Sequence, residues 1–473
     1  MTTRGLATFV NRTQELDALD VWHSRGGPGL GIVYGRRRVG KSWLLAKFAR
    51  GRRVVQHTAR GAALSEELRL LSQAAEPVLN LKRRSLAERP FTGWDDVIET
   101  FADAAESEPI VLILDEFPEL MRVSPNLEEE LRALWGRVTE THETHLKLLV
   151  CGSAVRVMES LQEERAAMFG RADLRLAVQP FRPHEAALML PNAAPVDRAA
   201  AWGVCGGIPR YLALWDDSAT FEQNLDRLVT SEQGLLLSEG ELVLADEDIV
   251  GHGGKRLPEQ VMRAIAAGST TFQTIQNHTG KLPTRVLGDL TRARLLDKVY
   301  PVGEDPERTK RTSYRIADNF LAFWLTCIEP HRGPIERGLG PTVKTVILAS
   351  FDDYMGPRYE DAFRSHLRRL AAQGLLGDVV DVGEWWRMQG EPSDDPCQLD
   401  AVVLEGRRRR PCAVGEAKWA KKVNGSSLLG GMRRKLFDSK LIDPDDVTFY
   451  ACARTAVDRS DGMQVVTASD IFG

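Results

Sequence analysis

The stretch of sequence that decides the fold is Leu30-Gly-Ile-Val-Tyr-Gly-Arg-Arg-Arg-Val-Gly-Lys-Ser42. From Gly35 onward it satisfies the pattern G-x-x-x-x-G-K-[ST], with a short apolar run before it and a helical pattern over 43–49 after it. Two glycines let the backbone curl, so that successive N–H groups and the helix start face phosphate oxygens. The stretch therefore predicts a phosphate-binding loop between a strand and a helix.

This loop predicts contacts to a nucleoside triphosphate. Lys41 supplies a positive charge to the β- and γ-phosphates, and the hydroxyl of Ser42 binds Mg²⁺. ATP and Mg²⁺ are the expected ligands. The nucleotide-binding residues predicted from this segment are Gly35, Arg36, Arg38, Val39, Gly40, Lys41, Ser42 and Trp43.

A second apolar run, Pro109-Ile-Val-Leu-Ile-Leu-Asp-Glu116, predicts a buried strand with acidic residues at its end. Asp115 is expected to hold Mg²⁺ through water, and Glu116 to polarise the attacking water. The next predicted strand ends near Ser153, which we expect to sense the γ-phosphate. Arg171 is either an arginine finger acting on a neighbouring copy in a homo-oligomer or a structural ion-pair residue.

Apolar runs alternate with helical segments up to residue 181, which predicts an α/β fold with a parallel sheet covered by helices. The predicted strands are 30–34, 53–57, 110–114 and 146–151. Helical segments over 195–203, 209–216 and 221–237 then predict a small helical lid. We divide the chain into a core over 1–188, a lid over 189–254, a third domain over 255–320 and a fourth over 321–473.

The third domain shows three helical segments and then two strands, an order typical of a winged helix. Its predicted recognition helix, 284–293, carries Arg285 and Arg292, and the predicted wing, 303–311, adds Arg308, Lys310 and Arg311. These cations either contact DNA or form solvated surface.

In the fourth domain, residues 399–404 and 413–419 predict two strands of a hairpin. Glu416 and Lys418 are two residues apart, so both side chains point to one face of their strand. Asp400 and Glu416 would ligate Mg²⁺, and Lys418 would hold or deprotonate the water nucleophile for phosphodiester hydrolysis. Glu360, on a helix predicted over 358–370, is a candidate third acid.

Charge is unevenly distributed along the chain. With 62 Lys and Arg against 66 Asp and Glu, the net charge of −4 excludes a uniformly basic nucleic-acid binder. Residues 405–440, however, hold eleven basic and three acidic residues, and we expect DNA to dock there.

The remaining composition limits the class of protein. Six scattered cysteines fit neither a disulfide framework nor a zinc site. No run of 18 apolar residues and no signal peptide is found, so we expect no membrane segment and a cytoplasmic location.

Several motifs together resemble the archaeal-type ATPases of the AAA superfamily, which are related to the signal-transduction ATPases with numerous domains. The resemblance spans about residues 5–215. It implies an AAA-type P-loop sheet with a helical lid, Asn11, Arg12 and Glu15 near the adenine, and Pro209 as a lid element that reads nucleotide state. The motifs are Phe9-Val-Asn-Arg-x-x-Glu-Leu16, the 35–42 loop, Leu114-Asp-Glu-Phe-Pro-Glu-Leu120, Cys151-Gly-Ser153, Phe169-Gly-Arg171 and Gly206-Gly-Ile-Pro-Arg-Tyr211.

Residues 314–324, 383–386 and 415–419 resemble the C-terminal domain commonly fused to these ATPases, which is similar to the PD-(D/E)xK nucleases. The resemblance implies a restriction-endonuclease-like α/β domain in which Asp400, Glu416 and Lys418 match the nuclease motif. The proline that names the motif is absent, because Gln398-Leu399 precedes Asp400.

Three functions remain open at this point. The first is an ATP-regulated, metal-dependent DNA endonuclease. The second is a nucleotide-gated DNA-binding or signalling protein with an inert nuclease fold. The third is an ATPase whose C-terminal domain binds another protein.

Overall fold

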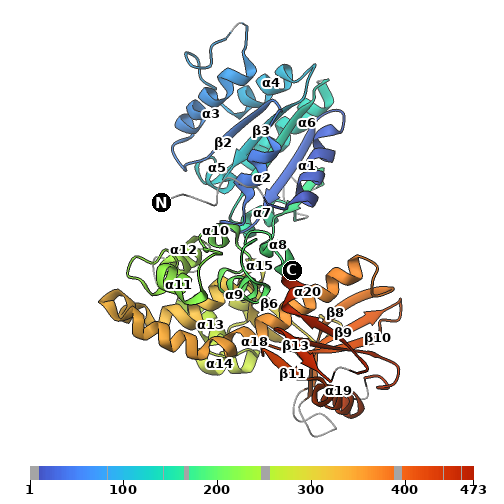
Figure 1. Ribbon diagram of the computed structural model, residues 1–473. Helices are drawn as coiled ribbons and strands as arrows, with labels where there is room; N and C mark the ends of the chain where they lie inside the picture. The colour runs from blue at the N-terminus through green and yellow to red at the C-terminus, as the bar shows by residue number, and fades with distance from the viewer. Residues whose placement is uncertain are drawn as a thin grey trace. The chain divides into compact units, whose positions relative to one another are not determined.

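The computed structural model describes residues 10–82, 84–141, 143–163, 170–246, 256–387, 397–439, 441–459 and 461–473. The described residues fall into two compact units, one ending at Gln179 and the other beginning at Pro180 (Figure 1). The division lies shortly before the predicted boundary between core and lid, and the four-domain arrangement stays a prediction.

The N-terminal unit is built on a five-stranded sheet in the order β2-β3-β4-β1-β5, with every pairing parallel. Four of its strands were predicted from apolar runs and are confirmed. The fifth was missed because its four residues, LRLA, alternate too briefly to stand out. The strands are β1 Gly29–Tyr34, β2 Val54–Thr58, β3 Ile110–Asp115, β4 Leu146–Gly152 and β5 Leu174–Ala177.

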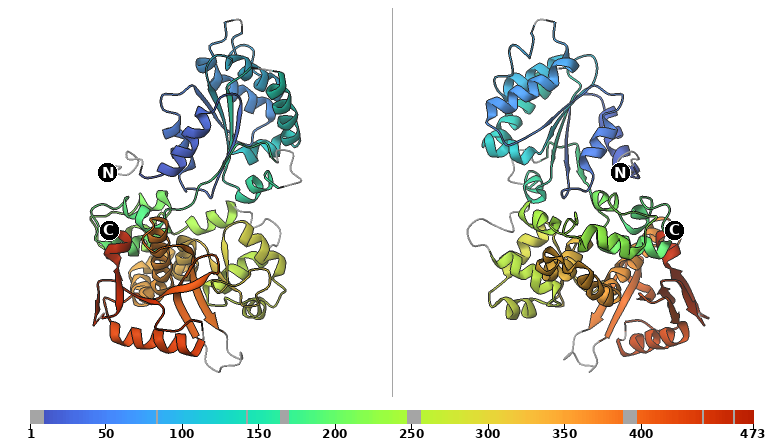
Figure 2. Two further views of the ribbon diagram at one scale, coloured as in Figure 1. Left: turned by 90° about the vertical axis from the view of Figure 1, so that its right-hand side faces the viewer. Right: turned by 60° about the vertical axis from the view of Figure 1, so that its left-hand side comes forward.

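Helices lie on both faces of this sheet (Figure 2). Every residue of β1, β3 and β4 is buried, as expected for parallel strands covered on both sides. Since β4 lies between β1 and β3, the chain segments that follow these three strands meet at one edge. The helices are α1 Thr13–Ser24, α2 Lys41–Phe48, α3 Leu64–Leu79, α4 Trp94–Ala104, α5 Phe117–Val123, α6 Leu127–Thr141 and α7 Val155–Ser160.

The C-terminal unit begins with short helices. The helix predicted over 221–237 is shorter than expected, because it ends in a π-helical turn, Asp226–Thr230. The helix predicted over 209–216 also ends early, at Leu212. The helices are α8 Pro183–Ala187, α9 Pro195–Cys205, α10 Pro209–Leu212, α11 Phe221–Leu225 and α12 Glu239–Asp246.

Three helices and an antiparallel hairpin follow in the predicted order: α13 Arg256–Ala266, α14 Phe272–Thr279, α15 Thr284–Arg292, β6 Leu296–Val299 and β7 Ser313–Ile316. The segment that joins the two strands is fastened within the unit. Val302 N donates to Glu384 O at 2.8 Å, and the Arg311 guanidinium donates to Trp386 O at 2.9 Å. Arg311 is therefore tied to the neighbouring strand rather than presented on a free wing, and the winged helix itself stays a prediction.

The second sheet has the order β14-β12-β10-β9-β8. The predicted hairpin is confirmed as the antiparallel pair β9 and β10, whereas β12 and β14 run parallel to β10. The strands are β8 Val379–Arg387, β9 Cys397–Glu405, β10 Arg410–Lys418, β12 Thr448–Ala453 and β14 Met463–Thr467, and a small pair is formed by β11 Lys422–Asn424 and β13 Ala456–Asp458.

Two long helices cover opposite faces of this sheet. Val414 of β10 packs with Met432 and Leu436 of α19, Gly425–Ser439. The next residue, Gly415, faces Phe363 of α18, where a Cβ would come within 2.7 Å of the ring. Successive strand residues point to opposite faces, so α18, Gly340–Ala372, lies on the other side.

The remaining elements connect or close the unit. They are α16 Asn319–Phe323, the turns Trp324–Ile328 and Glu329–His331, α17 Arg332–Pro334, the turn Ile335–Leu339 and the terminal α20 Ala468–Phe472. No helix among the described residues is long and apolar enough to cross a membrane.

The structure spreads the basic residues of 405–440 over a turn, a strand end and a helix, and the expectation that DNA docks there stays a prediction. The four arginines 407–410 lie at the turn between β9 and β10, whereas Lys418 ends β10. Six residues of extended strand separate Arg410 from Glu416, roughly 20 Å. Several of these cations are also paired within the unit, including Arg409 with Asp381, Lys422 with Asp458 and Arg433 with Asp445.

Candidate nucleotide and metal sites

The phosphate-binding loop has the backbone that its glycines predict. Gly40 has φ 96°, a left-handed conformation that favours glycine. At Gly35 a Cβ would lie 2.3 Å from Val178 O, so a larger residue would not fit. The buried Lys41 ammonium donates to Gly35 O at 2.7 Å and to Arg36 O at 3.2 Å. The loop therefore wraps around the lysine at the start of α2, where Ser42 and Trp43 are both exposed.

Arg12, in the segment before α1, forms hydrogen bonds that hold this loop in place. Its guanidinium donates to Val39 O at 2.8 Å and to Gln179 O at 2.6 Å, and it pairs with Glu15 at 2.7 Å. The side chain is buried, and the neighbouring Asn11 is half-buried. The sequence placed Arg12 near the adenine by resemblance and gave no sign of its contact with the loop, since the partners are backbone carbonyls far along the chain.

The predicted acidic strand end lies beside the predicted sensor. Asp115 is buried, and its Oδ1 accepts a hydrogen bond from Glu116 N at 3.0 Å. Ser153 Oγ donates to Glu116 Oε2 at 2.8 Å, and Ser153 N lies 3.3 Å from the same oxygen. Strand order explains this contact, because β4 is the neighbour of β3.

Two further side chains at this strand end were not singled out from the sequence. Gln56 of β2 donates to Asp115 Oδ2 at 3.5 Å. Burial, and then the negative charge of Asp115, raises the pKa of the Cys151 thiol at the end of β4. The thiol therefore stays protonated beside the carboxylate.

The remaining predicted residues are more scattered. Arg171 is exposed after the stretch 164–169, and Pro209 opens α10 in the C-terminal unit. Phe9 and Phe169, which belong to the motifs behind the resemblance, lie outside the described residues.

The structure brings Asp400, Glu416 and Lys418 together on the second sheet. Lys418 Nζ lies 3.2 Å from Asp400 Oδ2 and 3.1 Å from Glu416 Oε2, and Ala417 N donates to Asp400 Oδ2 at 3.0 Å. The side chains of Asp400 and Glu416 are only 6% and 4% exposed. Burial, and then the charge of Asp400, raises the pKa of Glu416. Although burial opposes it, the two carboxylates raise the pKa of Lys418, so its ammonium stays charged.

Lys435 is the functional candidate that the sequence did not single out. It reaches from α19 to Glu416, with 2.5 Å between Nζ and Oε1. The sequence counted it only as one cation of the basic segment. The spacing between Glu416 and Lys435 in the sequence matches no known motif, because their contact depends on how α19 packs against β10.

Glu360 belongs to α18, which lies on the face of the second sheet opposite to α19. Burial, and then the charge of Asp400, raises the pKa of Glu360 to about 8. Within the described ranges, no three His, Cys, Asp or Glu side chains lie close enough together to hold a metal ion. Asp400 and Glu416 thus form a two-carboxylate site, and the role of Glu360 as third ligand stays a prediction.

Residues 9–214 match a family described as an ATPase domain predominantly from Archaea. The chain carries an ATPase domain of the archaeal type. The predicted resemblance of this region to archaeal-type ATPases is thereby confirmed, and its placement in the AAA superfamily stays a prediction. Residues 324–428 match a family described as "Archaea bacterial proteins of unknown function", so the likeness of the C-terminal domain to nucleases stays a prediction.

Relatives of the archaeal-type ATPase domain come from archaea. An uncharacterised protein of Methanocaldococcus jannaschii is 25% identical over 451 residues, covering 93% of this chain and 94% of that protein. An uncharacterised ATP-binding protein of the same organism is 42% identical over 50 residues, or 11% of this chain and 85% of that protein. A Walker-type ATPase of Pyrococcus abyssi superposes with a TM-score of 0.53 at 18% identity, covering 68% of this chain and 97% of that chain, which shows a shared fold.

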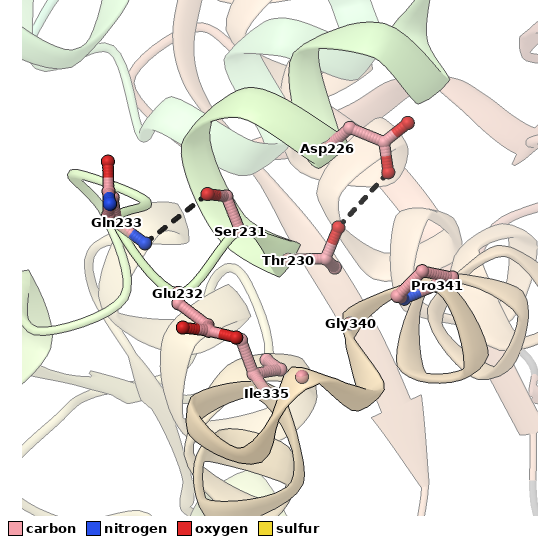
Figure 3. A pocket seen from close by; sticks show the side chains of 9 residues that line it. Asp226, Thr230, Ser231, Glu232, Gln233, Ile335, Gly340 and Pro341 are labelled. Atoms are coloured by element: carbon pink, nitrogen blue, oxygen red, sulfur yellow. Dashed lines mark hydrogen bonds between the residues drawn. The ribbon is translucent and has the colours of Figure 1, made fainter.

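A cavity of about 460 Å³ lies apart from the residues that the sequence singled out (Figure 3). It is lined by Asp226, Thr230, Ser231, Glu232, Gln233, Ile335, Gly338, Gly340 and Pro341. Its polar groups bond to one another: Thr230 Oγ1 donates to Asp226 at 3.2 Å, and Gln233 N donates to Ser231 Oγ at 3.2 Å. This arrangement gives the cavity no evident chemistry.

Proposed function

We propose that this chain is an ATP-hydrolysing switch of the AAA type coupled to a metal-dependent DNA endonuclease site. The observation that carries the proposal is the cluster of the buried Asp400 and Glu416 with the half-exposed Lys418, in a chain that also carries an archaeal-type ATPase domain. Two neighbouring buried carboxylates are expensive to bring together and to desolvate unless a metal ion or a charged partner compensates them.

The loop and the two acidic residues supply what ATP hydrolysis needs. Lys41 and the backbone N–H groups of the loop bind the phosphates, and Ser42 and Asp115 hold Mg²⁺. Glu116 orients and deprotonates the attacking water, and Ser153 holds that carboxylate in place. Arg171 acts on the nucleotide of a neighbouring copy.

The residues of the second site fit Mg²⁺, which binds proteins through one or two carboxylates and keeps several waters. Asp400 and Glu416 would hold the ion. When bound, it would stabilise negative charge on a phosphate oxygen and lower the pKa of a water. Lys418 orients that water. The element order α18-β8-β9-β10-β11-α19-β12 supports the proposal that this domain is nuclease-like.

DNA is the proposed substrate because a phosphodiester is the anion that this chemistry requires. Cations exposed on α15, above all Arg285, would bind its backbone through charge without reading its sequence.

One observation favours a second function, an inert nucleic-acid-binding module. Lys418 and Lys435 already balance the charge of the two carboxylates, so the cluster is held together without a metal.

The deciding experiment pairs two measurements on the full chain: nicking of supercoiled plasmid with Mg²⁺ or Mn²⁺, with and without ATP, and thermal melting without metal. Asp400→Asn should lose nicking while the protein still unfolds in one cooperative transition, even where loss of the charge that faces Lys418 lowers the melting temperature. Glu405→Gln, at the exposed other end of β9, is the matched control and should nick normally. Wild-type protein that is folded and never nicks would favour the inert module.

A further inference from the structure

The second site holds two ammonium groups against its two carboxylates. Lys418 comes from β10 itself and touches both acids, whereas Lys435 comes from α19 and touches Glu416 alone. Between them, Glu416 is held at both of its oxygens. A divalent cation bound by Asp400 and Glu416 must therefore compete with an ammonium group.

The two lysines are not equally easy to displace. Freeing Glu416 from Lys418 disrupts an ammonium that bridges two carboxylates, whereas freeing it from Lys435 breaks one charge-assisted hydrogen bond. Both side chains reach water, since 45% of Lys418 and 35% of Lys435 is exposed. The single contact of Lys435, at the end of a flexible stem, therefore makes its ammonium the easier one to displace.

The backbone of α19 near Lys435 is fixed, so only the side chain needs to move. Arg387 at the end of β8 donates to Asp438 O at 2.9 Å, and Cys397 at the start of β9 contacts Lys435 O at 3.7 Å. Met432 and Leu436, on either side of Lys435, are fully buried.

We propose that Lys435 is a positioning residue that holds Glu416 as a resident counter-ion, and that a divalent cation enters the site by displacing the Lys435 ammonium from Glu416 Oε1. The inference rests on the proposed metal function and adds the residue that controls entry of the metal ion. The free cation of Lys435 then lies beside the metal site, where a substrate phosphate is its natural new partner.

The test is titration of the nucleotide-free full chain with Mn²⁺, followed by calorimetry and by the Mn²⁺-induced shift in melting temperature. Lys435→Met and Lys435→Gln should bind Mn²⁺ about tenfold more tightly than the wild type, because no Lys435 ammonium then competes with the ion for Glu416 Oε1. Lys435→Arg keeps the charge and should show no gain. Arg434→Met, which removes the exposed neighbouring cation, should leave Mn²⁺ affinity unchanged.

The double variant Asp400→Asn, Lys435→Met ties the gain to this site, because it should lose the tighter binding. Equal or weaker Mn²⁺ binding by both Lys435→Met and Lys435→Gln, with Asp400-dependent binding in the wild type, overturns the gating role and leaves the metal site standing. Absence of Asp400-dependent Mn²⁺ binding in the wild type and every variant would instead overturn the metal function itself.

Discussion

The lysines of the two candidate sites contact different kinds of acceptor, neutral carbonyls in one site and charged carboxylates in the other. In the phosphate-binding loop, the Lys41 ammonium donates to the backbone carbonyls of Gly35 and Arg36. In the second sheet, the ammonium groups of Lys418 and Lys435 contact carboxylates. A neutral carbonyl is a weak partner that an anionic phosphate readily replaces, whereas a carboxylate is a strong one.

This difference indicates which kind of ligand each site can bind. The loop offers curled backbone N–H groups and an ammonium that a phosphate can draw away from neutral carbonyls, and so it suits an anion. The Asp400 and Glu416 pair suits a cation, which must first displace an ammonium. Substitutions at four residues test this difference between the sites, and they follow from the largest expected effect to the smallest.

Replacing Lys41 by alanine should have the largest effect. The change removes the ammonium at the centre of the loop, and we expect ATP affinity or turnover to fall on the order of hundredfold or more. Calorimetric titration with ATP and Mg²⁺ measures it, and Lys47→Ala, exposed farther along α2, is the control. ATP binding and turnover at the wild-type level would remove the loop from the account.

Replacing Glu116 by glutamine should separate binding from turnover. The amide keeps the shape and the hydrogen bond from Ser153 but cannot take a proton from water, so turnover should fall by about 10²–10³ while ATP affinity stays. Steady-state phosphate release is the measurement. Equal turnover in both proteins would exclude Glu116 from the mechanism.

Replacing Ser153 by alanine should have a smaller effect on the same step. The carboxylate of Glu116 remains but loses the 2.8 Å contact that orients it, and misplacement of a catalytic group lowers turnover by about tenfold to hundredfold. Ser153→Thr retains the hydroxyl and should restore most of the rate. If alanine and threonine behave alike, Ser153 does not position Glu116.

The smallest effect is a pH dependence at the second site. Burial and the charge of Asp400 raise the pKa of Glu360 from 4.5 to about 8, so the folded chain keeps a proton that the unfolded chain releases between these values. The free energy of unfolding should therefore fall as pH rises through this window. Glu360→Gln removes the dependence.

Melting temperatures measured without metal at pH 4.5 and pH 8 check this effect. Glu360→Gln should gain roughly 2–4 °C relative to the wild type at the higher pH. Asp353→Asn, an exposed carboxylate on the same helix, should show no such change between the two pH values. A constant difference for Glu360→Gln would contradict the raised pKa.

The sequence predicted the parts of both sites that depend on local pattern. The loop of 35–42 is defined by glycine conformation and by its position between strand and helix, and four of the five strands of its sheet contain short apolar runs. Asp400, Glu416 and Lys418 came from the period of two along a hairpin. In each case neighbouring residues in the chain carry the information.

The missed contacts join segments that are distant along the chain. Arg12 bonds to carbonyls at 39 and 179, and Lys435 meets Glu416 only through the packing of α19. The basic residues of 405–440 are likewise spread out, since the turn between β9 and β10 carries the arginines 407–410 away from Lys418 at the end of β10. Composition alone does not reveal that separation.

The central claim is that the chain has two independent sites, one that binds an anion and one that binds a cation. The most direct test measures the binding of both ligands to variants of each site in the full chain. ATP with Mg²⁺ and, separately, Mn²⁺ without nucleotide are titrated into the wild type, Lys41→Ala and Asp400→Asn. The account predicts that Lys41→Ala loses ATP and keeps Mn²⁺ affinity, while Asp400→Asn loses Mn²⁺ and keeps ATP affinity. Loss of both ligands from either folded variant, or Mn²⁺ binding that ignores Asp400, would contradict it.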